Sequence, residues 1–284
     1  YKLPFGAALL QFKSDGGALT LTAPAQLPLL NGQLALQKLI WRPAAGKQDR
    51  INAAFAVTGI DVGALCKLFG WPQFPGTLGG AVPSLRYSGD ALAFDGGLSV
   101  NVFDGFVDVT SLMMQQPFGV APLMSTDVDL RQLDLGQLTS VFDFGSITGK
   151  LDGAIHGLKL VNWHPVAFDA SLHADSGGRI SQRALKSLTA VGGGGIAAGL
   201  QGFALNLFKT FGYSRIGLSC TLRAGVCTMG GLGPAGGDAQ AGYTIVDGSG
   251  LPHISVIGHE RQVDWTTLVD RLKAATEGNG PVVQ

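Results

Sequence analysis

Strict alternation of apolar and polar residues is the feature that most constrains this chain, because it recurs along the first two-thirds of the sequence. Successive side chains of an extended strand point to opposite faces, so a period of two predicts strands with one buried face. Turn sequences such as Ser88-Gly89-Asp90 and Asp95-Gly96-Gly97 separate the alternating segments. The fold is therefore predicted to be mainly β with a few short helices. The apolar positions of its strands include Phe55, Val57, Leu98, Val100, Val102, Val166, Phe168, Leu172, Ile254 and Val256.

A second pattern, a strand end followed by Asp and a short apolar helical stretch, occurs at Asp61, Asp134 and Asp264. An Asp carboxylate at this position accepts hydrogen bonds from the free N–H groups of the opening helical turn and faces the positive end of the helix dipole. We predict that these residues are structural N-caps and not catalytic acids. Similar strand openings follow the first two copies, which indicates a repeating unit of about 70 residues.

The C-terminal third differs from the preceding repeats, and the chain is predicted to divide into β modules over 1–178, a C-terminal end over 179–276 and a disordered tail over 277–284. Ser181 is predicted to cap a first helix, and the spacing of Leu200, Phe203, Leu207 and Phe211 predicts a second. A hairpin, a strand pair and the helix that follows Asp264 complete this part. The helices are expected to cover an end of the sheet.

The cysteines allow two interpretations. Cys220 and Cys227 flank a segment that is typical of a hairpin turn, with the two thiols on roughly opposed strand positions. A disulfide bond there would imply an oxidising compartment such as the periplasm, and the alternative is a pair of buried free thiols. Cys66 lies in an apolar helical stretch and is predicted to be a core residue.

Composition and motifs narrow the function. Charged residues make up 14% of the chain, against roughly 25% in average domains, and the 20 basic and 20 acidic residues balance, which argues against a nucleic-acid partner. The histidines and cysteines lack metal-ligand spacing, the glycine runs lack a phosphate-binding Lys, and a nucleophile elbow is absent. We therefore predict a protein that is not an enzyme and has no cofactor and no metal.

The apolar strand faces can be accommodated in two ways. They can close over a packed, ligand-free core, as in a structural or interaction protein, or they can line a curved trough that holds lipid. In the first case the ten apolar strand residues named above are core. In the second they line a lipid groove. Alternation alone is compatible with both.

Several phrases of the sequence resemble a known family. They are Phe144-Gly145-Ser146-Ile147-Thr148-Gly149, Arg179-Ile180-Ser181-Gln182-Arg183-Ala184-Leu185, Leu218-Ser219-Cys220-Thr221-Leu222-Arg223, Tyr243-Thr244-Ile245-Val246 with Gly250-Leu251-Pro252, and Val263-Asp264-Trp265. In this order they are similar to the C-terminal portion of the AsmA-like envelope proteins of Gram-negative bacteria, in particular the YdbH type. The residues before about Leu130 share only the general style of the repeat.

The resemblance implies an elongated, strongly curved, antiparallel-rich β-sheet that forms a taco-like groove in the periplasm. Its implied function is movement of phospholipid between the inner and outer membranes, without ATP hydrolysis by the protein itself. An N-terminal segment that anchors the protein to the inner membrane is expected upstream of Tyr1. A small outer-membrane lipoprotein of the YnbE kind is the implied partner, by β-strand augmentation.

Overall fold

Antiparallel strands dominate the fold, which confirms the predicted mainly β class with a few short helices. The computed structural model describes residues 3–44, 46, 49–193, 195–197 and 208–276. Their contacts divide the chain into two units. Unit 1 comprises Tyr1–Val102, Phe106–Asp129 and His156–Pro165, and unit 2 comprises Phe103–Gly105, Leu130–Ile155 and Val166–Gln284. The predicted tail over 277–284 lies outside the described residues, and the predicted boundary at 178/179 stays a prediction.

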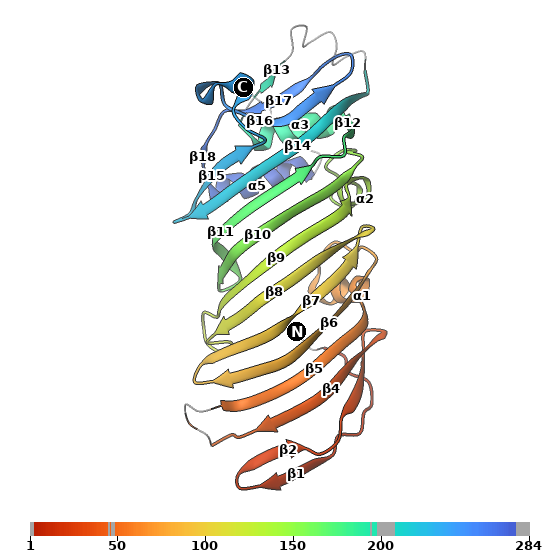
Figure 1. Ribbon diagram of the computed structural model, residues 1–284, viewed down its shortest axis with the longest axis vertical. Coiled ribbons are helices and arrows are strands. Elements are labelled where there is room, and N and C mark those ends of the chain that lie inside the picture. Colours follow the sequence, from red (N-terminus) through yellow and green to blue (C-terminus); the bar gives the residue numbers. More distant parts are fainter. Residues whose placement is uncertain (1–2, 45, 47–48, 194, 198–207, 277–284) are drawn as a thin grey trace. The chain divides into compact units, whose positions relative to one another are not determined.

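Unit 1 is built on strands that lie side by side (Figure 1). Strand β4 pairs with β5, β5 with β6 and β6 with β7, while the other edge of β4 pairs with β3 and β2, and β2 pairs with β1. The bounds of the elements are β1 Phe12–Asp15, β2 Ala18–Leu21, β3 Ala25–Leu29, β4 Gly32–Trp41, β5 Asp49–Asp61, α1 Val62–Phe69, β6 Gly76–Ser88, β7 Ala91–Val102 and β8 Gly105–Gln115.

Strands β9 Leu123–Asp134, β10 Lys150–Val161 and β11 His164–Ala174 have residues in both units. In unit 2 the long strand β14 pairs with β11, β12, β15 and β16, and β17 pairs with β16 and β13. The remaining bounds are α2 Leu135–Val141, β12 Gly178–Ser181, α3 Gln182–Val191, β13 Gly195–Ala197, β14 Thr210–Arg223, β15 Val226–Gly231, η1 Ala235–Gly237, η2 Ala239–Ala241, β16 Tyr243–Ser249, β17 Ser255–Gly258, β18 Gln262–Asp264 and α5 Trp265–Thr276.

The three aspartates of the repeated pattern cap helices, as predicted. The carboxylate of Asp61 accepts a hydrogen bond from the Ala64 N–H at 3.0 Å, and that of Asp134 accepts one from the Gln137 N–H at 2.9 Å. Asp264 accepts one from the Thr267 N–H at 3.0 Å. Ser181 does the same for α3. Each helix therefore begins directly where a strand ends, because the capping residue satisfies an N–H group that would otherwise lack a partner.

The cap of α1 predicts a pH dependence. Hydrogen bonds from the Ala64 N–H and the Asn31 side chain hold the pKa of Asp61 below its ordinary value of 3.8. The pKa is therefore lower in the folded state, so Asp61 contributes stability above about pH 3.8 that is lost as the pH falls through the lowered value. NMR titration of the carboxyl carbon should show the Asn31→Ala variant titrating closer to 3.8 than the wild type. Identical midpoints would contradict the assignment.

The cap of α5 predicts a loss of stability. Asp264→Ala removes the acceptor for the Thr267 N–H and should lower the free energy of unfolding by about 1 kcal/mol. Asp264→Asn keeps a side-chain oxygen at the same place and should retain most of the stability. Chemical denaturation of both variants measures the difference. If Asn destabilises as much as Ala does, the side chain stabilises α5 by some means other than capping.

The core of unit 2 is closed by helices. Helices α3 and α5 pack against each other and lie over strands of this unit (Figure 1). Beneath them Leu222, Ile245 and Val256 are fully buried, and the ring of Trp265 at the start of α5 meets that of Phe168 edge to face, with centroids 5.3 Å apart. Burial also raises the pKa of Tyr213 to about 12. Unit 2 therefore has the packed interior of an ordinary domain.

The hairpin of β14 and β15 carries Cys220 and Cys227. The structure joins them in a disulfide bond, with Cα atoms 5.5 Å apart. Cys220 lies opposite Met229 in the register and Cys227 opposite Leu222, so the two cysteines are diagonal neighbours on one face of the hairpin. Cys66 is free and buried in α1, as expected for a core residue.

Two local predictions are wrong. Asp95-Gly96-Gly97 is not a turn, because it lies inside β7, where Gly96 opposes two residues of β6, Val82 and Pro83, in a β-bulge. Gly96 has a φ of +106° and lies close to Ala81, which a side chain would not allow. Phe211 is not helical either, since it lies in β14 and pairs with Ile180 of β12. Leu200, Phe203 and Leu207 of the same predicted helix lie outside the described residues.

Candidate functional site

The strongest candidate site is one face of strands β4 to β7, which we call the apolar face of unit 1. The register sets its members side by side: Leu34 opposes Val57, Val57 opposes Gly80, and Gly80 opposes Leu98. The neighbouring rows add Leu36 and Phe55 on one side and the pair Leu78 and Val100 on the other. Every side chain that these rows contribute is apolar, because alternation sends the polar neighbours to the opposite surface. The apolar face consists of Leu34, Leu36, Phe55, Val57, Leu78, Leu98 and Val100.

Helix α1 closes one end of this face. A Cβ built at Gly76 would lie 3.4 Å from the Val62 side chain of α1 and 3.5 Å from Val102, so these two valines flank the glycine. Val102 is accordingly buried, and so is Ile60, which opposes Leu78 in the next row. The end of the apolar face next to α1 is thus packed.

Several side chains of the apolar face are only partly buried. Phe55, Leu98 and Val100 are only half-buried, as are Leu34, Leu36 and Leu78. Of the twelve largest fully buried side chains among the described residues, Ile60 lies in unit 1 and the other eleven lie in unit 2. Apolar side chains that neighbour one another yet stay in contact with solvent mark a surface suited to an apolar ligand. This contrast in burial separates the two units.

The residues predicted to line a groove therefore fall into three groups. Phe55, Leu98 and Val100 are half-buried on the apolar face, whereas Val57 and Val102 are buried there. In unit 2, Phe168, Ile254 and Val256 are 7%, 1% and 0% exposed, so they are core residues of the unit. The third group is Val166, which is exposed, and Leu172, which is half-buried.

Sequence reasoning missed Leu78, Leu85 and Phe94. The register places Leu85 opposite both Ala53 and Phe94, so that row continues the apolar face away from α1. The alternating pattern that would identify these residues is weak, because Gly79, Gly80 and the bulge at Pro83 interrupt it in β6. Only the pairing of β6 with β5 and β7 reveals the apolar row.

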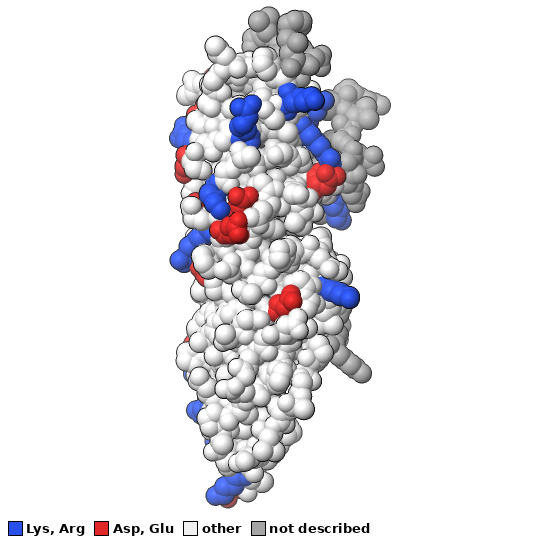
Figure 2. Space-filling model, turned by 90° about the vertical axis from the view of Figure 1, so that its right-hand side faces the viewer, with Lys and Arg blue, Asp and Glu red and all other residues white. Residues whose placement is uncertain are grey.

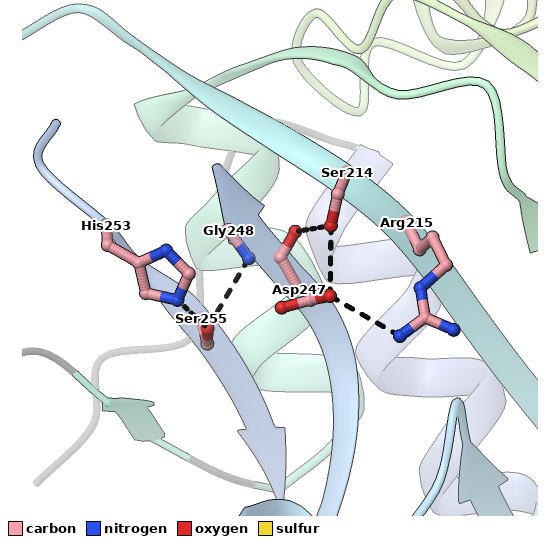
Figure 3. Close-up of polar contacts among 6 residues, drawn as sticks. All are labelled: Ser214, Arg215, Asp247, Gly248, His253 and Ser255. Atoms are coloured by element: carbon pink, nitrogen blue, oxygen red, sulfur yellow. Dashed lines mark hydrogen bonds and ion pairs between the residues drawn. The ribbon is translucent and has the colours of Figure 1, made fainter. Parts of the chain in front are cut away.

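A polar cluster in unit 2 brings together Ser, His and Asp without forming a catalytic relay (Figure 3). The Ser214 hydroxyl donates to the Asp247 carboxylate at 2.9 Å and to its carbonyl oxygen at 3.1 Å, and Arg215 donates to the same carboxylate at 3.4 Å. The His253 Nε2 instead lies 3.5 Å from the Ser255 hydroxyl, which accepts from the Gly248 N–H. Because the β14–β16 register shifts at Ser214, these bonds replace lost ladder bonds and hold the strands together.

Charge and metal chemistry give no further site. Figure 2 shows a surface that is mostly uncharged on the side turned to the viewer. Across the described residues, three or more His, Cys, Asp or Glu side chains never group in a way that could hold a metal ion. Within the same residues no helix combines the length and the apolar character needed to cross a membrane.

Comparison with known proteins adds no identification, since no family model, curated protein or solved structure matches the chain. The resemblance to AsmA-like envelope proteins stays a prediction from the sequence.

Proposed function

We propose that unit 1 binds phospholipid by holding acyl chains on its apolar face, as a module that conducts lipid between the inner and outer membranes of a bacterial envelope. The observation that supports this proposal is the partial exposure of the apolar face to solvent, where Phe55, Leu98 and Val100 are only half-buried. A structural domain of this composition would be expected to cover such side chains, as unit 2 does.

The energetics of the face suit transport of lipid. Each methylene group that an acyl chain removes from water contributes about 0.8 kcal/mol. Rows of Leu, Val and Phe offer this gain at many equivalent positions along the strands, so a chain can slide without leaving a single deep site. The charged headgroup would remain in water, which avoids the large cost of burying it.

The location and the partner belong to the same proposal. A disulfide bond between Cys220 and Cys227 is consistent with the periplasm, because cytosolic thiols are kept reduced. Anchoring to the inner membrane by a segment upstream of Tyr1, and pairing with a small outer-membrane lipoprotein by β-strand augmentation, rest on the family resemblance. Lipid binding by unit 1 can therefore be tested without assuming this location, anchor or partner.

The packed interior of unit 2 favours the alternative function for that unit. Ile254 and Val256 are buried and helices α3 and α5 cover the strands, so a lipid has no access to these side chains. We therefore propose a structural or interaction role for unit 2, based on its packed core.

Site-specific photo-crosslinking tests the proposal. A benzophenone amino acid at Leu98 places the reactive group on the apolar face, and the same amino acid at Ser99 places it on the opposite face of the same strand. We expect phospholipid adducts from cells at position 98 and a small fraction of that yield at position 99. Equal yields at both positions, or adducts at neither, would reject lipid binding on this face.

A further inference from the structure

The opposite face of the same strands carries a hollow of ≈ 340 Å³. It lies within unit 1 and is lined by Val57, Thr58 and Gly59 of β5, by Thr77, Leu78, Gly79 and Gly80 of β6, by Ser99 and Asn101 of β7, and by Phe106 of β8. Thr77, Ser99 and Asn101 alternate along their strands with Leu78, Leu98 and Val100, which places these three polar side chains on the surface opposite the apolar face. A ligand held by these three polar side chains therefore binds on the opposite surface of the sheet from a lipid on the apolar face.

The floor of the hollow is made of glycine, and one of these glycines is not required by the fold. Gly59 has a φ of +65°, and Gly80 lies against the backbone of Gly97, so the backbone explains both. Gly79 differs, because its φ is not in the left-handed region and an added Cβ would meet only the Val57 carbonyl oxygen, at an ordinary contact distance of 3.5 Å. Glycine at position 79 therefore leaves the floor of the hollow open where a side chain would fit.

The walls of the hollow offer hydrogen bonds without charge. Thr58, Thr77 and Ser99 contribute hydroxyl groups and Asn101 contributes a carboxamide, while no charged side chain lines the hollow. Within the described residues, the side chains of Thr58, Thr77, Ser99 and Asn101 make no hydrogen bond to another side chain. The ring of Phe106 is 48% exposed, although an aromatic ring gains by being covered.

We infer that this hollow binds a neutral saccharide. Sugar hydroxyl groups both donate and accept hydrogen bonds, as the hydroxyl and carboxamide groups of the walls do. The C–H face of a sugar ring can cover the Phe106 ring, and the glycine floor gives the ring room to approach the sheet. An anionic ligand would lack a cationic partner among the lining residues. The volume lies at the small end of ligand pockets, roughly 300–1,000 Å³, and suits one or two sugar rings.

NMR titration of the full chain with two neutral disaccharides, N,N′-diacetylchitobiose and cellobiose, tests this inference. We expect at least one of them to shift the backbone amide signals of Ser99, Asn101 and Phe106 in a saturable way. Phe106→Ala removes the stacking surface and should weaken binding about tenfold. If neither sugar produces saturable shifts at these residues, the inference is wrong.

Gly79→Ile provides the sharper variant, because it fills the floor of the hollow without a steric conflict in the backbone. It should abolish the saccharide-induced shifts while the protein stays folded. The control is Asn52→Ala, since Asn52 lies on the same face of β5 outside the hollow and its loss should leave the affinity unchanged. Saccharide binding that survives both Gly79→Ile and Phe106→Ala would place the sugar elsewhere and overturn the assignment.

Discussion

Val100→Asp should leave the protein folded and should remove the phospholipid that copurifies with it. Val100 is only half-buried on the apolar face, where a carboxylate can stay in contact with water, so the fold should tolerate the charge. An acyl chain that packed against this position would have to remove water from the carboxylate, at a cost of several kcal/mol. We therefore expect lipid occupancy to fall at least about tenfold, as measured by lipid extraction and mass spectrometry.

The matched control is Ser99→Asp, which introduces the same charge one residue away but on the opposite face of β7. This variant should keep the lipid occupancy of the wild type. Circular dichroism of both variants establishes that they are folded. If Val100→Asp retains its lipid, or if Ser99→Asp loses lipid to the same degree, the assignment of faces in unit 1 is wrong.

Phe168→Glu should instead unfold unit 2. Phe168 is buried, opposes the fully buried Leu222 in the register and packs against the Trp265 ring. The substitution removes that packing and buries a carboxylate without a partner, and we expect a loss of roughly 3–5 kcal/mol in the free energy of unfolding. Such a loss is a large fraction of the stability of a typical domain. Chemical denaturation followed by tryptophan fluorescence measures it.

Val166→Glu is the control for this prediction, because Val166 lies on the same face of β11 two residues earlier but is exposed. Its effect should stay within about 0.5 kcal/mol, as for most surface substitutions. If Phe168→Glu proves as mild as Val166→Glu, the helices do not seal unit 2 as described.

The features that sequence reasoning predicted well depend on neighbouring residues. The N-caps at Asp61, Asp134 and Asp264 need only a carboxylate and an N–H group three residues later, so a short pattern is sufficient to find them. The hairpin between β14 and β15 was equally accessible, since turn residues and alternation lie within one short segment.

The failures have a different origin. Asp95-Gly96-Gly97 has the composition of a turn, and only its pairing with the Pro83 segment of β6 makes it a bulge. Alternation also cannot tell an open apolar face from a packed one. Phe55 and Phe168 belong to similar alternating segments, yet Phe168 is sealed by Trp265, which lies far away in the sequence. Burial by a distant helix is a property of tertiary packing, and the period of two contains no information about it.

Native mass spectrometry of the protein, purified without detergent from a bacterial periplasm, tests the central claim most directly. Binding of phospholipid by unit 1 predicts a mass above that of the apo chain, with phospholipid recovered by extraction and lost in Val100→Asp. A folded wild-type protein that shows the apo mass alone, even after incubation with phospholipid vesicles, would contradict lipid binding and would favour a structural role for both units.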